Sequence, residues 1–143
     1  FAEAWAERPC LVATDGFYEW ADRGRSRRQP VRIYDPTGPF ALGGIWTTDD
    51  TGDPTVAIIT CAANDVVAPI HDRMPVVVPD GAYDRWLRGS PDARRALCAP
   101  AGGDGLTAVE ISTMVNDPSN DRPAVIEPLR GAQAGLDRFS SGG

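Results

Sequence analysis

The chain has 143 residues, of which 42% are hydrophobic and 24% charged, and its net charge is −6. This length and composition are typical of one globular domain, and no apolar run approaches the roughly 20 residues that span a bilayer. The acidic balance excludes general attraction to nucleic acid, because phosphates bind positive charge, so only a local arginine surface could bind DNA.

The first half of the chain predicts one short helix followed by strands. Residues 1–8 have the apolar spacing of a helix that Pro9 ends. A strand begins at Cys10, and after a turn at Asp15 and Gly16 a second strand carries three aromatic side chains. Alternating or continuous apolar runs predict three further strands, at 29–36, 39–49 and 55–63. The last run is nearly all apolar, so we expect it in the centre of the sheet.

The second half predicts shorter elements. Asn64 is expected to cap a helical turn over 64–70, before a brief strand at 74–79. Two helices are expected at 80–89 and 90–99, with Ser90 as the N-cap of the second. A last strand covers 106–112, and the Gly-, Ala- and Ser-rich residues 131–143 are expected to form a flexible tail. These elements predict one α+β domain with a mixed, barrel-like sheet of short strands and a few flanking helices.

Two side chains are candidates for proton transfer. Glu19 shares a strand face with Phe17, so partial loss of solvation would raise its pKa towards neutrality. The alternative is a glutamate exposed on an edge strand. His71 is the only histidine, in the segment IHDRMP, and its ordinary pKa lies close to physiological pH. The alternative is a turn residue bonded to the backbone.

Arginines and cysteines suggest other possibilities. Arg73 could bind a phosphate or pair with Asp72, whereas Met74 is expected in the core. The run RGRSRR, residues 23–28, is either a DNA-binding surface or a solvated hairpin loop. The cysteines lie far apart and form no CxxC pair, so we expect reduced thiols and no metal site. All 14 basic residues are arginine, so no lysine can supply a nucleophilic amine.

Four segments together resemble the SRAP family (SOS response-associated peptidase domains). They are CLVATDGFYEW, FALGGIW, IITCAANDVVAPIHDRMPVVV and VNDPSNDRPAVIEP, and they occur in this order between Cys10 and Pro128. The resemblance implies an enzyme that crosslinks itself to abasic sites in single-stranded DNA, with autopeptidase and lyase-like activity. In this chemistry an N-terminal cysteine, exposed by self-removal of the initiator Met, forms an imine with the sugar aldehyde and then a thiazolidine.

The resemblance also implies roles for six residues. Glu19 corresponds to the family's catalytic acid/base, and His71 to the histidine that assists sugar-ring opening or later proton transfer. Residues that fall where the family meets DNA are Trp20, Thr60, Arg73 and Met74. We further expect no cofactor and no metal, a monomer when the protein is complete, and a cytoplasmic protein that joins the nucleoid when it binds DNA.

The chain departs from the family pattern at its start. The family's Met-Cys-Gly-Arg opening and its Asn-x-Arg motif are absent, and Cys10 matches an internal strand position. We therefore expect residues 1–130 to be the larger C-terminal part of one SRAP-like domain, with a sheet incomplete at its N-terminal side and no activity alone. Three alternatives stay open: a non-covalent DNA-binding module built on Trp20, Arg73 and the RGRSRR loop, a general peptidase, and an α+β domain without this chemistry.

Overall fold

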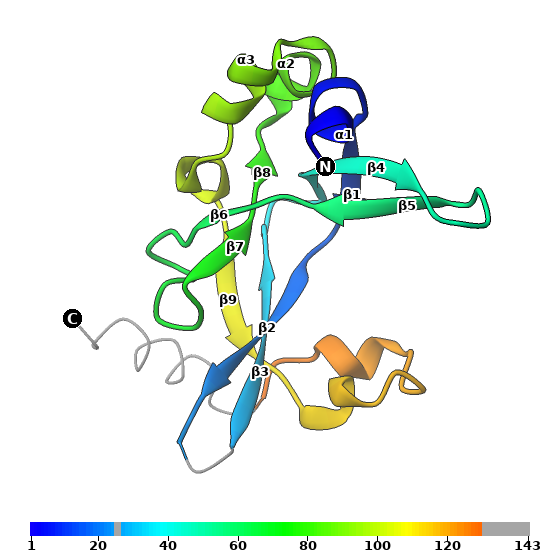
Figure 1. Ribbon diagram of the computed structural model, residues 1–143. Coiled ribbons are helices and arrows are strands. Elements are labelled where there is room, and N and C mark those ends of the chain that lie inside the picture. Colours follow the sequence, from blue (N-terminus) through cyan, green and yellow to red (C-terminus); the bar gives the residue numbers. More distant parts are fainter. Residues whose placement is uncertain (25–26, 130–143) are drawn as a thin grey trace.

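The computed structural model describes residues 1–24 and 27–129, and the flexible tail expected at 131–143 lies outside them. Within this part the strands form three antiparallel sheets (Figure 1). The first has the order β1 (Pro9–Thr14), β4 (Phe40–Thr48), β5 (Pro54–Ile58), with β8 (Val77–Val78) also on β4. The second has the order β2 (Phe17–Asp22), β3 (Arg28–Tyr34), β9 (Thr107–Glu110), and the third pairs β6 (Thr60–Ala62) with β7 (Arg73–Pro75). The α+β class is confirmed, and the described strands do not close into a barrel.

Short helices gather at one end of the molecule, away from the β2–β3 hairpin (Figure 1). They are α1 (Ala2–Glu7), α2 (Tyr83–Arg88) and α3 (Pro91–Ala96). The 3₁₀ turn η1 (Asp80–Ala82) leads directly into α2, and η2 (Pro100–Gly103), η3 (Thr113–Asn116) and η4 (Pro123–Ile126) follow later in the chain. The predicted cap of α3 is confirmed, because the Ser90 hydroxyl accepts the Ala93 N–H at 3.1 Å. None of the helices in residues 1–24 and 27–129 is long and apolar enough to cross a membrane.

Trp86 of α2 anchors the helices on the first sheet. The side chain is fully buried, and its Nε1 donates to the Cys10 carbonyl at 2.8 Å. Its ring lies directly against the backbone of β4, since a Cβ on Gly43 would be only 2.5 Å from it. The missing side chain of Gly43 therefore allows this close approach of the ring to the backbone.

A buried arginine joins the three helices. Arg94 of α3 is 1% exposed, and its guanidinium donates to three backbone carbonyls. The acceptors are Trp86, at 2.7 Å, Gly89, at 3.1 Å, and Trp5 of α1. Because buried cations are costly unless every donor is used, these bonds fix the position of α1 against α2 and α3.

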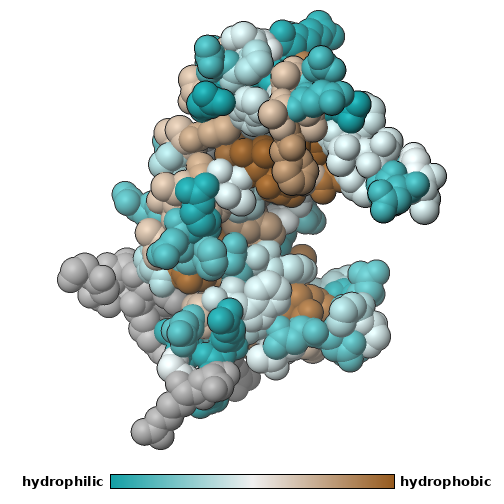
Figure 2. Space-filling model, viewed as in Figure 1, coloured by the Kyte–Doolittle hydropathy of each residue, from teal (hydrophilic) through white to brown (hydrophobic). Residues whose placement is uncertain are grey.

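One expectation about strand placement was wrong. The apolar run 55–63 divides at Ile59 into β5 and β6, and β5 lies at the edge of its sheet while β4 is central. Val56 is 54% exposed and Ile58 38%. The space-filling view shows an uncovered hydrophobic area below the helical end of the molecule (Figure 2). The predicted turn at Asp15 and Gly16 is present as a bend, and it joins strands of two different sheets, because β1 pairs with β4 and β2 with β3. The chain passes there from one sheet to the next.

Candidate functional site

Glu19 lies on β2, the edge strand of the second sheet. It pairs directly with Val31, which is fully buried, so its side chain starts from the inner face of the sheet. Glu19 itself is half-buried. Burial raises the pKa of its carboxyl group, while the charge of His71 acts in the opposite direction and lowers it. Both sequence interpretations therefore hold in part: the strand is an edge strand, and the carboxyl group is desolvated.

His71 is held by a capped turn and by its own backbone. The Asn64 side-chain oxygen accepts the N–H groups of Val66 and Val67, as the predicted cap requires. The His71 N–H then donates to the Val67 carbonyl at 2.9 Å, and its Nδ1 accepts the Arg73 N–H at 3.0 Å. Nδ1 also lies 3.1 Å from the Arg73 carbonyl oxygen, so both contacts hold this side of the ring against the Arg73 backbone. The histidine is thus a turn residue with a fixed ring, placed near Glu19.

Arg73 is oriented across the β6–β7 hairpin. Its Nη2 donates to the carbonyl of Thr60 at 3.0 Å and to the hydroxyl of the same residue at 3.2 Å. Both side chains are exposed, and within the described part of the chain Arg73 forms no ion pair with Asp72. One edge of the guanidinium is therefore fixed by protein, and the remaining N–H groups face solvent.

Trp20 and Met74 lie outside the group formed by Glu19, Thr60, His71 and Arg73. Trp20 is on the opposite face of β2 from Glu19, where its Nε1 donates to the Asn116 side chain at 2.7 Å. Met74 is 1% exposed, and its sulfur accepts the Asn64 N–H at 3.3 Å. The structure thus groups Glu19 with three residues of the β6–β7 hairpin, and we call Glu19, Thr60, His71 and Arg73 the acid–histidine cluster.

Comparison with known proteins identifies the family. Residues 1–118 match the family described as SOS response associated peptidase (SRAP). The chain belongs to this family. Abasic site processing protein YoqW of Bacillus subtilis (strain 168) is 34% identical to it over 136 residues, which cover 89% of this chain and 60% of YoqW. Abasic site processing protein HMCES of Gallus gallus is 31% identical over 146 residues, 84% of this chain and 43% of that protein. This SRAP chain thus spans at most about 60% of either relative.

Solved structures agree with the SRAP assignment and with the predicted fold. The crystal structure of a protein from Bacteroides thetaiotaomicron matches 91% of this chain and 60% of that one, with a TM-score of 0.80 at 26% identity. A protein from Bordetella bronchiseptica matches 78% of this chain and 59% of its own, with a TM-score of 0.68 at 27% identity. The SRAP-like α+β architecture expected from the sequence is therefore confirmed.

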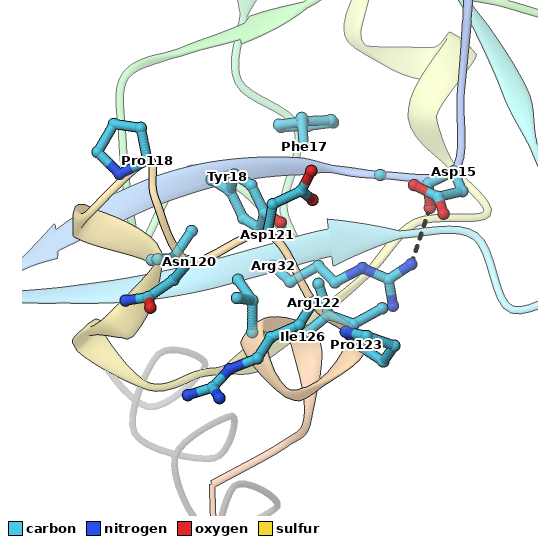
Figure 3. A pocket seen from close by; sticks show the side chains of 13 residues that line it. Asp15, Phe17, Tyr18, Arg32, Pro118, Asn120, Asp121, Arg122, Pro123 and Ile126 are labelled. Atoms are coloured by element: carbon cyan, nitrogen blue, oxygen red, sulfur yellow. Dashed lines mark hydrogen bonds between the residues drawn. The ribbon is translucent and has the colours of Figure 1, made fainter.

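Sequence reasoning missed a groove of about 620 Å³ on the outer face of the second sheet (Figure 3). It lies between β2 and the segment that contains η3 and η4, and Tyr18, Arg32 and Arg122 help to line it. The Arg32 guanidinium lies 4.5 Å from the centre of the Tyr34 ring and donates to the Asp15 carbonyl at 3.1 Å. The residues that line the groove come from two segments more than 80 positions apart, so no local pattern could have indicated it.

The cysteines of this SRAP chain are free thiols at internal positions, namely Cys10, Cys61 and Cys98. Burial raises the pKa of each thiol, which lowers its thiolate fraction and hence its reactivity. Among residues 1–24 and 27–129, no group of three or more His, Cys, Asp and Glu side chains could hold a metal ion. Acid–base chemistry at the acid–histidine cluster is the reactivity that these residues support best.

Proposed function

We propose that this SRAP chain recognises abasic sites in single-stranded DNA and binds the sugar of the lesion between Glu19 and His71. The observation that carries the proposal is this pair: a half-buried carboxyl group with a raised pKa close enough to the histidine to feel its charge. Relatives named abasic site processing proteins, at 31–34% identity, support the choice of lesion.

Proton transfer is the work that this pair would do. The sugar of an abasic site must open from a ring to an aldehyde, which moves the proton of the C1 hydroxyl to the ring oxygen. A carboxyl group with a raised pKa accepts and returns a proton near neutral pH more readily than an ordinary glutamate. The Nε2 of His71, when it carries a proton, can donate to the ring oxygen, because Nδ1 is already engaged by the backbone of Arg73.

For the covalent step we propose the chemistry that the family resemblance implies. An N-terminal cysteine of the full-length protein, freed by removal of the initiator Met, adds its amine to the aldehyde and water is lost to give an imine. Its thiol then adds to the imine carbon and closes a thiazolidine. None of the three cysteines described above carries an α-amino group, so the described residues would contribute binding and proton transfer to this step.

DNA would be held by groups around the pair. The free edge of the Arg73 guanidinium suits a phosphate, and Thr60 keeps it in place. Because β2 is an edge strand, a nucleotide that passes around it reaches Trp20 and can stack there without any sequence readout. Met74 supports this surface from beneath, since its side chain is buried.

A crosslinking assay tests the proposal. The full-length protein is incubated with an abasic single-stranded oligonucleotide, and the covalent adduct is followed on denaturing gels. Glu19→Gln and His71→Ala should each slow adduct formation roughly 10²-fold or more, as loss of a general acid or base does. Asp72→Asn is the matched control, because this exposed neighbour makes no side-chain bond within the described residues. Equal rates for all four proteins would contradict the proposal.

Non-covalent binding without chemistry is the second candidate function. It is favoured by the thiols, which are internal and have a raised pKa. Tight binding of abasic DNA by the full-length protein with no adduct on denaturing gels would support this function and exclude the covalent one. General peptidase activity has no support in the described geometry beyond the family's name.

A further inference from the structure

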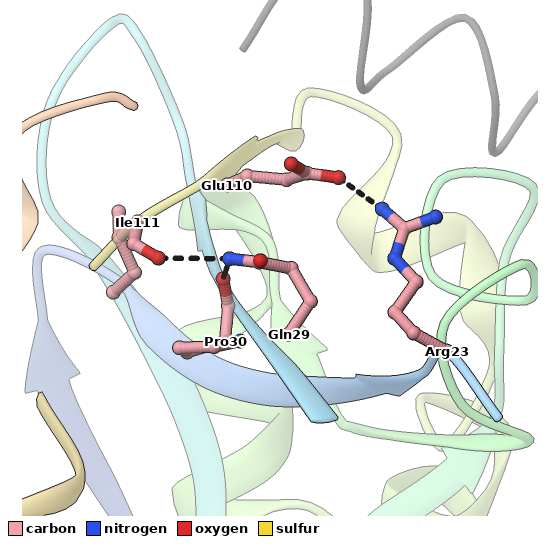
Figure 4. Close-up of polar contacts among 5 residues, drawn as sticks. All are labelled: Arg23, Gln29, Pro30, Glu110 and Ile111. Carbon is pink, nitrogen blue, oxygen red and sulfur yellow. Dashed lines mark hydrogen bonds and ion pairs between the residues drawn. The ribbon is translucent and has the colours of Figure 1, made fainter. Parts of the chain in front are cut away.

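A basic pocket of about 430 Å³ lies at the tip of the β2–β3 hairpin (Figure 4). Its lining residues are Arg23, Arg27, Arg28, Gln29, Glu110 and Thr113. Backbone bonds shape the turn beside it: the Arg23 N–H donates to the Arg27 carbonyl at 2.9 Å, and the Arg27 N–H to Gly24 at 3.0 Å. Gly24 has φ +73°, a conformation that glycine adopts without strain. The pocket therefore stands on a defined hairpin.

The pocket is also tied to the third strand of its sheet. Figure 4 shows Gln29, whose side-chain N–H groups donate to the carbonyls of Pro30, at 3.0 Å, and of Ile111, at 2.8 Å. On the same side Arg23 forms an ion pair with Glu110 of β9. The contacts with Ile111 and Glu110 join residues more than 80 positions apart, so the pocket floor has a fixed shape.

The charge of the pocket is strongly positive for such an acidic protein. Three guanidinium groups face one carboxylate, which gives a local charge of about +2 while the whole chain carries −6. Arg27 and Arg28 are exposed, and no carboxylate of residues 1–24 or 27–129 lies within ion-pair distance of either. A ligand with more than one negative group would satisfy them, and successive phosphates of a nucleic-acid strand have this character.

The pocket lies on the same sheet face as Glu19. Glu19 pairs with Val31, and Val31 pairs with Glu110, so the three side chains share one face. Gln29 pairs with Ala21, two residues along β2 from Glu19, on that face as well. From Glu19 to Arg23 the strand advances about 13 Å. A stacked strand advances about 3.4 Å per nucleotide, so at most about four nucleotides bridge this distance.

We infer that the hairpin-tip pocket is a second phosphate site, which holds the DNA backbone a few nucleotides to one side of the lesion bound at Glu19 and His71. Arg27 and Arg28 contact the phosphates, while Arg23 and Gln29 keep the pocket in shape. The inference rests on the proposed function, because it assumes that single-stranded DNA occupies the Glu19 face. It adds a direction to that function, because the pocket holds the DNA backbone on only one flank of the lesion.

The test compares two double variants of the full-length protein. Arg27→Ala/Arg28→Ala removes the proposed contacts, and Arg88→Ala/Arg95→Ala removes the same charge from α2 and α3, where both arginines face carboxylates at the other end of the molecule. The affinity for an abasic single-stranded oligonucleotide is measured at several salt concentrations. The first variant should lower the slope of log K against log salt by about 1.4, or 0.7 per lost phosphate contact, with the preference for abasic over intact DNA unchanged. The control variant should keep the wild-type slope.

A second series removes nucleotides from either flank of the lesion. Truncation of one flank to fewer than about four nucleotides should weaken binding by the wild type, but not by Arg27→Ala/Arg28→Ala. Equal slopes for both double variants, with abasic preference intact, would overturn the inference and leave the proposed function standing. If the wild type bound abasic and intact DNA equally well, both the inference and the proposed function would be overturned.

Discussion

Glu19 fits both interpretations of its sequence position, because it lies on an edge strand and its carboxyl group is partly desolvated. The strand β2 has an open edge, but Phe17 and the buried Val31 beside Glu19 desolvate the carboxyl group enough to raise its pKa. A raised pKa in the folded state means that folding favours the protonated form. The stabilising effect is therefore complete below the group's ordinary value of 4.5 and is lost as the pH rises through the folded pKa.

Glu19→Gln should remove this pH dependence. The free energy of unfolding is measured with urea at a series of pH values from below 4.5 to above neutrality. The variant should gain stability relative to the wild type as the pH rises, because the neutral amide has no charge to desolvate. Glu7→Gln, an exposed change in α1, is the control. The same pH profile for the wild type and both variants would argue against a desolvated Glu19.

Arg94 is the second residue whose environment makes a sharp prediction. Arg94→Met keeps an unbranched apolar side chain but leaves three carbonyls without their donors, so unfolding should require at least about 3 kcal/mol less. Arg95→Met, one position along α3, should change stability by no more than about 0.5 kcal/mol, because its ion pair with Asp92 is exposed. Chemical denaturation of both variants measures the difference. Equal losses of stability in the two variants would contradict the role of Arg94 in joining the helices.

At the scale of elements, the contact between β4 and α2 depends on the absence of one side chain. Gly43→Ala would place a Cβ 2.5 Å from the Trp86 ring, and the ring cannot move freely because its Nε1 is bonded to Cys10. We expect a loss of about 1–3 kcal/mol from overpacking. Gly81→Ala is the control, since a Cβ there meets nothing within 4 Å. Thermal denaturation of the two variants tests the contact, which would be disproved by equal melting temperatures.

Most elements could be predicted from local patterns, whereas their pairing could not. The alternation of Val31 and Ile33 with polar neighbours correctly predicted β3, with both apolar side chains fully buried. The run 55–63 was misplaced because an apolar strand looks the same at the centre of a sheet and at an edge with uncovered side chains. Whether the strand is central or lies at an edge is decided by its pairing with β4, whose position depends on contacts far away in sequence.

At the scale of the whole molecule, the candidate site comes from two segments about 50 residues apart. The local features were visible in the sequence: a glutamate next to a phenylalanine face, and a histidine in a proline-bounded turn. That His71 lies near Glu19 depends on where the loop between β6 and β7 is placed relative to β2, which no spacing specifies. The groove near Tyr18 was hidden for the same reason, and so was the part of Glu110 in the basic pocket, although the arginines of the RGRSRR run were visible in the sequence.

The central claim is abasic-site recognition. Its most direct test compares the binding of two single-stranded oligonucleotides of one sequence, one of them with a single abasic site. Fluorescence anisotropy gives the affinity of the purified protein for each, at one stated salt concentration, with Glu19→Gln/His71→Ala measured beside the wild type. Tighter binding of the abasic strand by the wild type, with that preference reduced in the double variant, is the predicted result. Equal affinity of the wild type for both strands would contradict abasic-site recognition by this protein.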